Sequence, residues 1–463
     1  MVALEKVCIP TVGIVARSFV RAWQSCVDGW GQRGAAFVTI PHATTGQTVE
    51  FIHAMVDEQI DAVISGLTAP TVHPSLPAAA KSSEIHTVEI DDTPEGLNAV
   101  NRFFEARDLS DGLPVVPPTP AAVERLLKAT RRDPQEVLMV MEPGFGLATV
   151  EKIAINAVMA GCGPEQFPVL LAAIACLAQP QMNHRDMQVS GHAESPLILV
   201  NGPAASRAGL NVGLTAMGPG VVNRANTAIG RALRLCLINI GNCKPGSGDP
   251  NFIGLPAKFG MCLAENEEAS PWPPYHVDQG YRREQSAVTV AIVTGPADII
   301  DSRSKTAVDT MQNIGSMMSY RNAGAGTWVR ERPSAQIGNT DEKTYYHGPY
   351  HPIILSPTRA VTLAQAGMSK QDVQAWLHAH CRVRLRDITG HGTVLGLHNM
   401  PKDPGGRWIN HPELQMLEQD PEATVPALER QEQYLLFVSG GSTHCGHFFY
   451  GTYGIATQPV EEE

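Results

Sequence analysis

The stretch from Gly213 to His276 constrains the fold and chemistry of this chain more than any other part of the sequence. A glycine-rich loop, 217–224, comes first, and an apolar helix is expected over Ala225–Ile240. An acidic segment, 264–272, then leads to His276. A glycine-rich loop that opens a helix lets a ligand approach the backbone, and the free N–H groups of the first helical turn favour anions. We therefore expect the active site in this stretch.

The loop and the start of the helix are predicted to bind the substrate. Arg224 and Arg231 are seven residues apart and share one face of a helix that is otherwise apolar. Arginines on a buried helix need anionic partners. Two kinds of partner stay open: a carboxylate or phosphate of the substrate, or a glutamate among Glu265, Glu267 and Glu268. The predicted binding residues are Gly218, Gly220, Asn223, Arg224, Asn226 and Arg231, with Asn223 as the N-cap of the helix.

The acidic segment supplies the predicted catalytic residues Glu265, Glu267 and His276. Carboxylates and an imidazole can transfer protons, and they are also ligands for a hard or borderline divalent metal ion. Glu265 and Glu268 are three apart and would share a face if the segment were helical. Prolines at 271, 273 and 274 end any helix before His276, so the site would converge through a loop. A divalent metal ion is therefore a candidate cofactor, and the sequence does not define which metal it is.

Two further groups of residues are candidate sites. Cys162 lies in a Gly-Cys-Gly-Pro turn between two expected helices, where a thiol at a helix N-terminus would have a lowered pKa and could act as a nucleophile. Near the C-terminus, an expected strand over 435–439 runs into a glycine-rich turn with His444, Cys445 and His447, which we predict to bind a metal. The alternatives are a buried, inert thiol and a glycine-rich loop with incidental histidines.

The composition excludes several classes of protein. The chain has 463 residues, which is enough for two or three domains, and its net charge of −11 argues against nucleic acid and anionic membranes as partners. No apolar run approaches the roughly 20 residues of a membrane span. Nine scattered cysteines indicate reduced thiols, so we expect a cytoplasmic location.

Apolar runs and helical patterns alternate along the chain and predict an α/β fold. Strands at 9–16 and 36–40, with helices at 19–30 and 44–65, form an N-terminal parallel βαβα fragment, residues 1–70. A segment rich in Pro, Ala, Ser and Thr, 71–95, is predicted to be a linker. Residues 96–463 are predicted to form one large α/β domain that carries the active site.

Several short motifs resemble known proteins. The motifs Leu4-Glu5-Lys6, Ile9-Pro10-Thr11-Val12 and Ile40-Pro41-His42 resemble the UGSC-like family of (seleno)proteins, which is distantly similar to the selenoprotein subunits of glycine and proline reductases. The segments 111–116, 151–162, 201–203, 223–226 and 264–272 look like the larger protein often found beside UGSC-like domains. The resemblance covers most of the chain, and it implies a thiol- or metal-dependent lyase or reductase.

The chain departs from that family at one point. The family's Sec/Cys-Gly-Ser-Cys motif would lie upstream of Ile9, and the eight residues before Ile9 do not contain it. The resemblance then implies a second subunit that supplies the motif, or a homo-oligomer that covers the exposed strand.

Two functions remain open at this point. The first is an enzyme subunit that acts on a small anionic or polar molecule and cleaves or reduces a carbon–heteroatom bond. The second is a non-catalytic scaffold subunit of a hetero-oligomer whose partner holds the redox motif.

Overall fold

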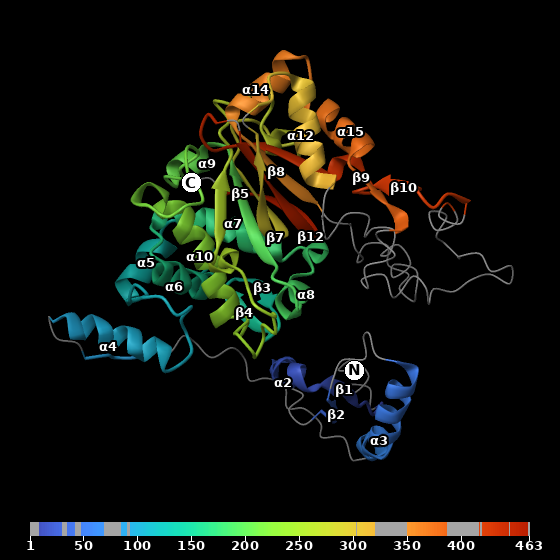
Figure 1. The fold of residues 1–463 in the computed structure, drawn as a ribbon. Helices are drawn as coiled ribbons and strands as arrows, with labels where there is room; N and C mark the ends of the chain where they lie inside the picture. The colour runs from blue at the N-terminus through green and yellow to red at the C-terminus, as the bar shows by residue number, and fades with distance from the viewer. Residues whose placement is uncertain are drawn as a thin grey trace.

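The computed structural model describes most of the chain, and the bulk of it is one α/β body (Figure 1). The described residues are 9–29, 35–41, 48–68, 85–89, 93–301, 303–319, 350–386, 416, 419–443 and 445–461. The α/β class predicted from the sequence is confirmed, with the predicted parallel strand pair near the N-terminus.

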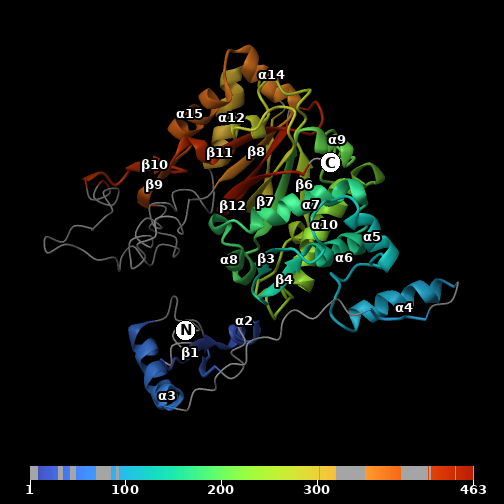
Figure 2. The ribbon, with the colours of Figure 1, turned by 180° about the vertical axis from the view of Figure 1, so that it is seen from behind.

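The N-terminal residues form a small βαβα unit. Strand β1 (Gly13–Ala16) pairs in parallel with β2 (Phe37–Ile40), and α2 (Val20–Gly29) connects them. Helix α3 (Val49–Thr68) follows β2 and packs against the strand pair. Figures 1 and 2, which are opposite views, both show this unit apart from the large body. The order of strands and helices is the one predicted, although the strands are shorter.

A six-stranded mixed sheet is the centre of the body, in the order β11-β8-β12-β7-β5-β6. Its strands are β5 (Ser195–Asn201), β6 (Met261–Ala264), β7 (Ala287–Ile300), β8 (His351–Leu355), β11 (Tyr434–Val438) and β12 (Cys445–Pro459). The long antiparallel pair of β7 and β12 is irregular between Phe449 and Ile455, where the register shifts twice. Such irregularities bend a strand, so one half of β12 pairs with β8 and the other half continues only along β7.

Two groups of helices cover different parts of this bent sheet. Helices α6 (Val150–Ala160), α7 (Phe167–Leu177) and α10 (Arg224–Asn239) pack on β5, β6 and the first half of β7. Helices α12 (Ala307–Ser319), α14 (Pro357–Gln365) and α15 (Lys370–His380) pack on β8, β11 and the end of β7, as both views show. Helix α7 is buried on nearly all sides, which explains its almost continuous apolar sequence.

The opposite side of the bent sheet encloses a third apolar cluster and brings the two edge strands together. Side chains from all six strands, including Leu199, Leu263 and Phe437, pack with one another inside the curve. At one end the edges β6 and β11 meet, because the N–H of Asn266 donates to the carbonyl of Val438 at 2.7 Å. The sheet thus approaches a closed barrel at the carboxyl ends of β6 and β11.

The remaining elements lie around this frame. The helices are α4 (Pro94–Glu105), α5 (Pro120–Leu127), α8 (His184–Val189), α9 (Pro203–Arg207) and α11 (Tyr275–Asp278). The strand pairs are β3 (Val137–Met141) with β4 (Gly146–Thr149), and β9 (Arg382–Arg384) with β10 (Thr424–Pro426). Short 3-10 turns are η1 (Arg17–Phe19), η2 (Pro164–Gln166), η3 (Pro180–Met182), η4 (Val221–Asn223), η5 (Pro256–Phe259) and η6 (Gln431–Gln433). Within the described residues, no helix has the length and apolarity that crossing a membrane requires.

Candidate functional site

The end of β6 places Glu265 where the two edges of the sheet meet. One carboxylate oxygen of Glu265 accepts hydrogen bonds from Asn201 Nδ2 at 2.7 Å and from the backbone N–H of Tyr275 at 2.8 Å. The other oxygen accepts from the backbone N–H of Val438 at 3.3 Å. A single side chain therefore joins the ends of β5, β6 and β11 to the first residue of α11.

The close approach of α10 fixes the start of β6. Gly260 has a φ of 130°, and a Cβ at this position would lie 2.2 Å from the backbone carbon of Gly230 in α10. Glycine at both positions therefore lets the helix contact the backbone of the turn before β6 directly. This contact sets the position from which β6 runs to Glu265.

Burial changes the ionisation of Glu265. The side chain is almost completely removed from solvent. Desolvation raises the pKa of Glu265, and the positive charge of Lys370 and the three hydrogen bonds oppose that rise without cancelling it. A carboxyl group with a raised pKa keeps its proton to a higher pH and can act as a proton donor.

Glu267 and His276 lie next to each other in the same cluster. One oxygen of Glu267 accepts from the backbone N–H of Gly202 at 2.6 Å and from Asn201 Nδ2 at 3.2 Å. The same oxygen is 3.8 Å from Nδ1 of His276. His276 is 0 % exposed, and neither of its ring nitrogens has a hydrogen-bond partner. The carbonyl oxygen of the Asn201 side chain is also buried without a partner.

Contacts with α15 and with the turn before it hold the short helix α11 in place. The Lys370 ammonium group, nearly buried at the start of α15, lies 2.7 Å from a carboxylate oxygen of Asp278 at the end of α11. The indole N–H of Trp272 donates to the carbonyl of Met368 at 2.9 Å. These two contacts anchor the segment that carries His276 on both sides.

The structure thus brings together three predicted catalytic residues, Glu265, Glu267 and His276, through a loop as expected. Glu268 does not join them, because residues 265–274 are not helical and its side chain points to solvent. Sequence analysis missed Asn201 and Lys370. Asn201 ends a buried strand and precedes a glycine and a proline, which is a signal that we could have used; Lys370 gave no such signal.

The glycine-rich loop is tied together by its own asparagines. Asn223 Nδ2 donates to the carbonyls of Thr215 at 2.7 Å and Gly218 at 2.8 Å, and Asn223 makes no side-chain cap on α10. Asn226 accepts from the N–H of Asn211 at 2.9 Å. Asn223 is therefore at the N-cap position of α10, as predicted, but its side chain caps no N–H of the helix and shapes the loop instead. Gly220, with a φ of 143°, provides the turn that only glycine adopts easily.

The arginines of α10 have partners outside the acidic segment. Arg231 forms a bidentate pair with Asp111, at 2.7 and 2.8 Å, and Arg234 lies 2.8 Å from Asp249. Arg224 is exposed, and its guanidinium donates to the carbonyl of Gly161 at 3.4 Å. The glutamates are thus not the partners of these arginines, and Arg231 has a structural partner in the protein itself.

The environment of Cys162 is opposite to the predicted one. The thiol is buried in the apolar core against α6, α7 and α10. Desolvation raises the pKa of Cys162 to about 12, and the nearby charge of Arg224 offsets this only in part. The predicted lowering of the Cys162 pKa is therefore wrong, because loss of hydration outweighs the turn position, and the raised pKa does not favour a nucleophilic thiol.

The predicted C-terminal metal group is only partly described. His444 lies outside the described residues. Cys445 and His447 are two apart on β12, and His447 Nε2 is 3.0 Å from Asp298 Oδ1 on the neighbouring strand β7. Within the described part of the chain, no three His, Cys, Asp or Glu side chains converge as a metal site.

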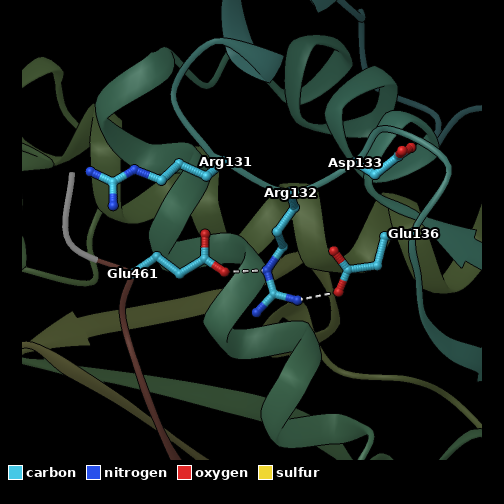
Figure 3. Close-up of a pocket in the computed structure, with 5 residues that line it drawn as sticks. All are labelled: Arg131, Arg132, Asp133, Glu136 and Glu461. Atoms are coloured by element: carbon cyan, nitrogen blue, oxygen red, sulfur yellow. Dashed lines mark hydrogen bonds and ion pairs between the residues drawn. The ribbon is translucent and has the colours of Figure 1, made fainter.

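A surface pocket of about 540 Å³ lies away from this cluster (Figure 3). It is lined by Arg131, Arg132, Asp133, Glu136 and Glu461. Arg132 lies between two carboxylates, 2.5 Å from Glu136 and in contact with Glu461 near the C-terminus. These pairs fasten the end of the chain, and we assign the pocket no part in the candidate site.

Comparisons with known proteins identify no relative. The likeness to the UGSC-like family and its neighbour therefore remains a prediction from short motifs. No protein-family model matches this sequence, no curated protein is detectably similar to it, and no solved structure detectably matches it.

Proposed function

We propose that this chain is an enzyme, or the catalytic subunit of one, that transfers protons to and from a small polar substrate. The reaction centre is the cluster of Asn201, Glu265, Glu267 and His276. One observation carries the proposal: a completely buried histidine leaves both ring nitrogens without a partner, 3.8 Å from a glutamate. An unpaired buried polar group costs about 1–3 kcal/mol, and such groups persist mainly where function needs them.

The roles follow from the contacts of each group. Glu265, whose pKa is raised by burial, is the proton donor. His276 accepts or returns a proton through a ring nitrogen, and Glu267 orients the imidazole and stabilises its charged form. Asn201 Nδ2 holds both carboxylates in place.

The charges of the cluster favour a neutral or cationic polar substrate. Lys370 is paired with Asp278, and the two glutamates have no arginine partner within the described residues. The side chains of Glu267 and His276 and the free carbonyl of Asn201 also have the donor types that a divalent metal ion takes, and a bound ion would polarise the substrate. Since the Cys162 thiol is buried with a raised pKa, proton-driven cleavage of a carbon–heteroatom bond fits better than thiol-dependent reduction.

The test uses a mixture of small polar metabolites incubated with the protein in deuterium oxide and analysed by mass spectrometry. Wild type should consume at least one compound or label it with deuterium, and His276→Gln and Glu267→Gln should not. The matched control is His378→Gln, because His378 bonds the carbonyl of Glu429 far along the sequence from the cluster. Metal content of wild type and Glu267→Gln is measured in parallel.

Two outcomes would contradict the proposal. In the first, His276→Gln and Glu267→Gln each process the mixture as fast as wild type. The other is a wild-type protein that changes nothing and binds no metal, which would favour the non-catalytic scaffold.

A further inference from the structure

Helix α3 has a face that packs on its own sheet. Ile52 and Val63 are half-buried and Met55 is buried, and their spacing follows one side of a helix. Gly66 belongs to the same side, since a Cβ there would lie 2.7 Å from a Val12 methyl group. This face accounts for how α3 attaches to β1 and β2.

A second apolar stripe on α3 faces solvent. Its residues are Val49, Val56, Ile60, Ile64 and Leu67, with 62, 48, 43, 52 and 41 % of their surface exposed. Steps of seven, four, four and three residues place them on one side of the helix, beside the sheet-facing side. A helix attached by one face needs only one apolar stripe, so packing on the sheet does not account for the second stripe.

An acidic flank borders the exposed stripe on the side away from the sheet. At ~100° per residue, Glu50, Asp57 and Asp61 come next to the stripe, and Glu58 lies further round. The sequence of α3 contains no lysine or arginine. Four carboxylates without a cation therefore lie along one edge of the apolar stripe.

We propose that this stripe is a docking site for a partner polypeptide that presents an apolar helix bordered by lysine and arginine. The apolar side chains would supply the contact area, and the acidic flank would select the charge of the partner. A second copy of this chain fits poorly, because pairing two α3 helices through their stripes brings carboxylates towards each other in a protein of net charge −11. An anionic membrane is disfavoured for the same reason.

The test measures the binding of labelled helical peptides to the full chain by fluorescence anisotropy. Two peptides of the length of α3, 20 residues, share one leucine pattern, and their polar positions are all lysine in one and all glutamate in the other. The lysine peptide should bind at least about tenfold more tightly. Ile60→Gln with Ile64→Gln should weaken its binding by about tenfold. Asp57→Asn with Asp61→Asn should weaken binding and reduce its dependence on salt between about 0.02 and 0.15 M.

The matched control is Val221→Gln, which changes a 91 % exposed apolar residue on another part of the chain. It should leave peptide binding unchanged. All substituted residues are exposed, and circular dichroism of each variant is measured to check that it folds. Equal binding of the two peptides, or unchanged binding by the Ile60/Ile64 variant, would refute the proposal. The proposal would also be refuted if the wild type formed a dimer, or bound lipid vesicles, and the Ile60/Ile64 variant did not.

Discussion

His276 combines complete burial with two unpaired ring nitrogens, and this combination costs stability. If the residue is kept for function, an apolar replacement should be tolerated by the fold. We predict that His276→Leu leaves the free energy of unfolding unchanged or raises it by about 1 kcal/mol, and abolishes turnover. Urea denaturation measures the first effect. His378→Leu, which loses a hydrogen bond to Glu429, should show no such gain; a strong destabilisation of His276→Leu would indicate a structural role instead.

A second buried carboxyl, Glu194, should make stability depend on pH. Desolvation raises the pKa of Glu194 from 4.5 to about 7, against the lowering effect of Ser190, Thr452 and Lys258. The folded state then binds a proton that the unfolded chain releases. The stabilising contribution is therefore present below pH 4.5 and is lost as the pH rises through 7.

We predict that Glu194→Gln removes this dependence. As the pH rises from acid to slightly alkaline, the free energy of unfolding of the variant should increase by ~3 kcal/mol relative to that of wild type. Urea titrations at several pH values test this prediction, with Glu165→Gln, a change of an exposed glutamate on η2, as the control. If the free energies of unfolding of wild type and Glu194→Gln changed with pH in parallel, the pKa of Glu194 would not be raised in the folded protein.

Helix α10 depends on ion pairs that connect it to distant segments. The side chains of Arg231 and Asp111 are 14 % and 3 % exposed, so removing one partner leaves a buried charge. Arg231→Ala should lower the free energy of unfolding by about 3–5 kcal/mol. The exposed Arg224→Ala should cost far less.

The joint replacement Arg231→Met with Asp111→Leu distinguishes a structural role of this ion pair from a role in ligand binding. It should recover much of the lost stability, since no uncompensated charge remains. Urea denaturation of the three variants measures these differences. If Arg231→Ala is as stable as wild type but binds metabolites poorly, Arg231 is a ligand-binding residue after all.

The whole molecule consists of a small unit and a large body with different amounts of core. Among described residues, the N-terminal unit buries Val15, Val27, Val38, Ile40 and Met55, whereas three large clusters stabilise the body. A two-stranded sheet with so few buried side chains has little stability of its own.

We therefore predict two unfolding transitions in calorimetry of the full chain. A fragment that begins at residue 93 should lose the lower transition and keep the Tm of the upper one. A shared single transition, or a markedly lower Tm of the fragment, would show that the unit and the body unfold together.

The sequence alone determined the order of the N-terminal unit and the place of several elements of the body, α10 among them. Helix α10 was expected over Ala225–Ile240 and runs from Arg224 to Asn239, because a mainly apolar segment between a glycine-rich loop and a turn favours a buried helix. Likewise, the prolines before His276 predicted the loop through which the acidic segment converges on it. Periodicity and chain-breaking residues are local properties, so a single segment is sufficient to read them.

Only the tertiary structure decided which residues meet and how each one ionises. The pairing of Arg231 with Asp111 joins positions 120 residues apart, and the burial of Cys162 results from three helices that pack around it. Val438 of β11 donates to Glu265 of β6 only because the sheet bends until its edges touch. Hydration, partner distance and electrostatic field depend on this long-range packing, and no local pattern in the chain encodes them.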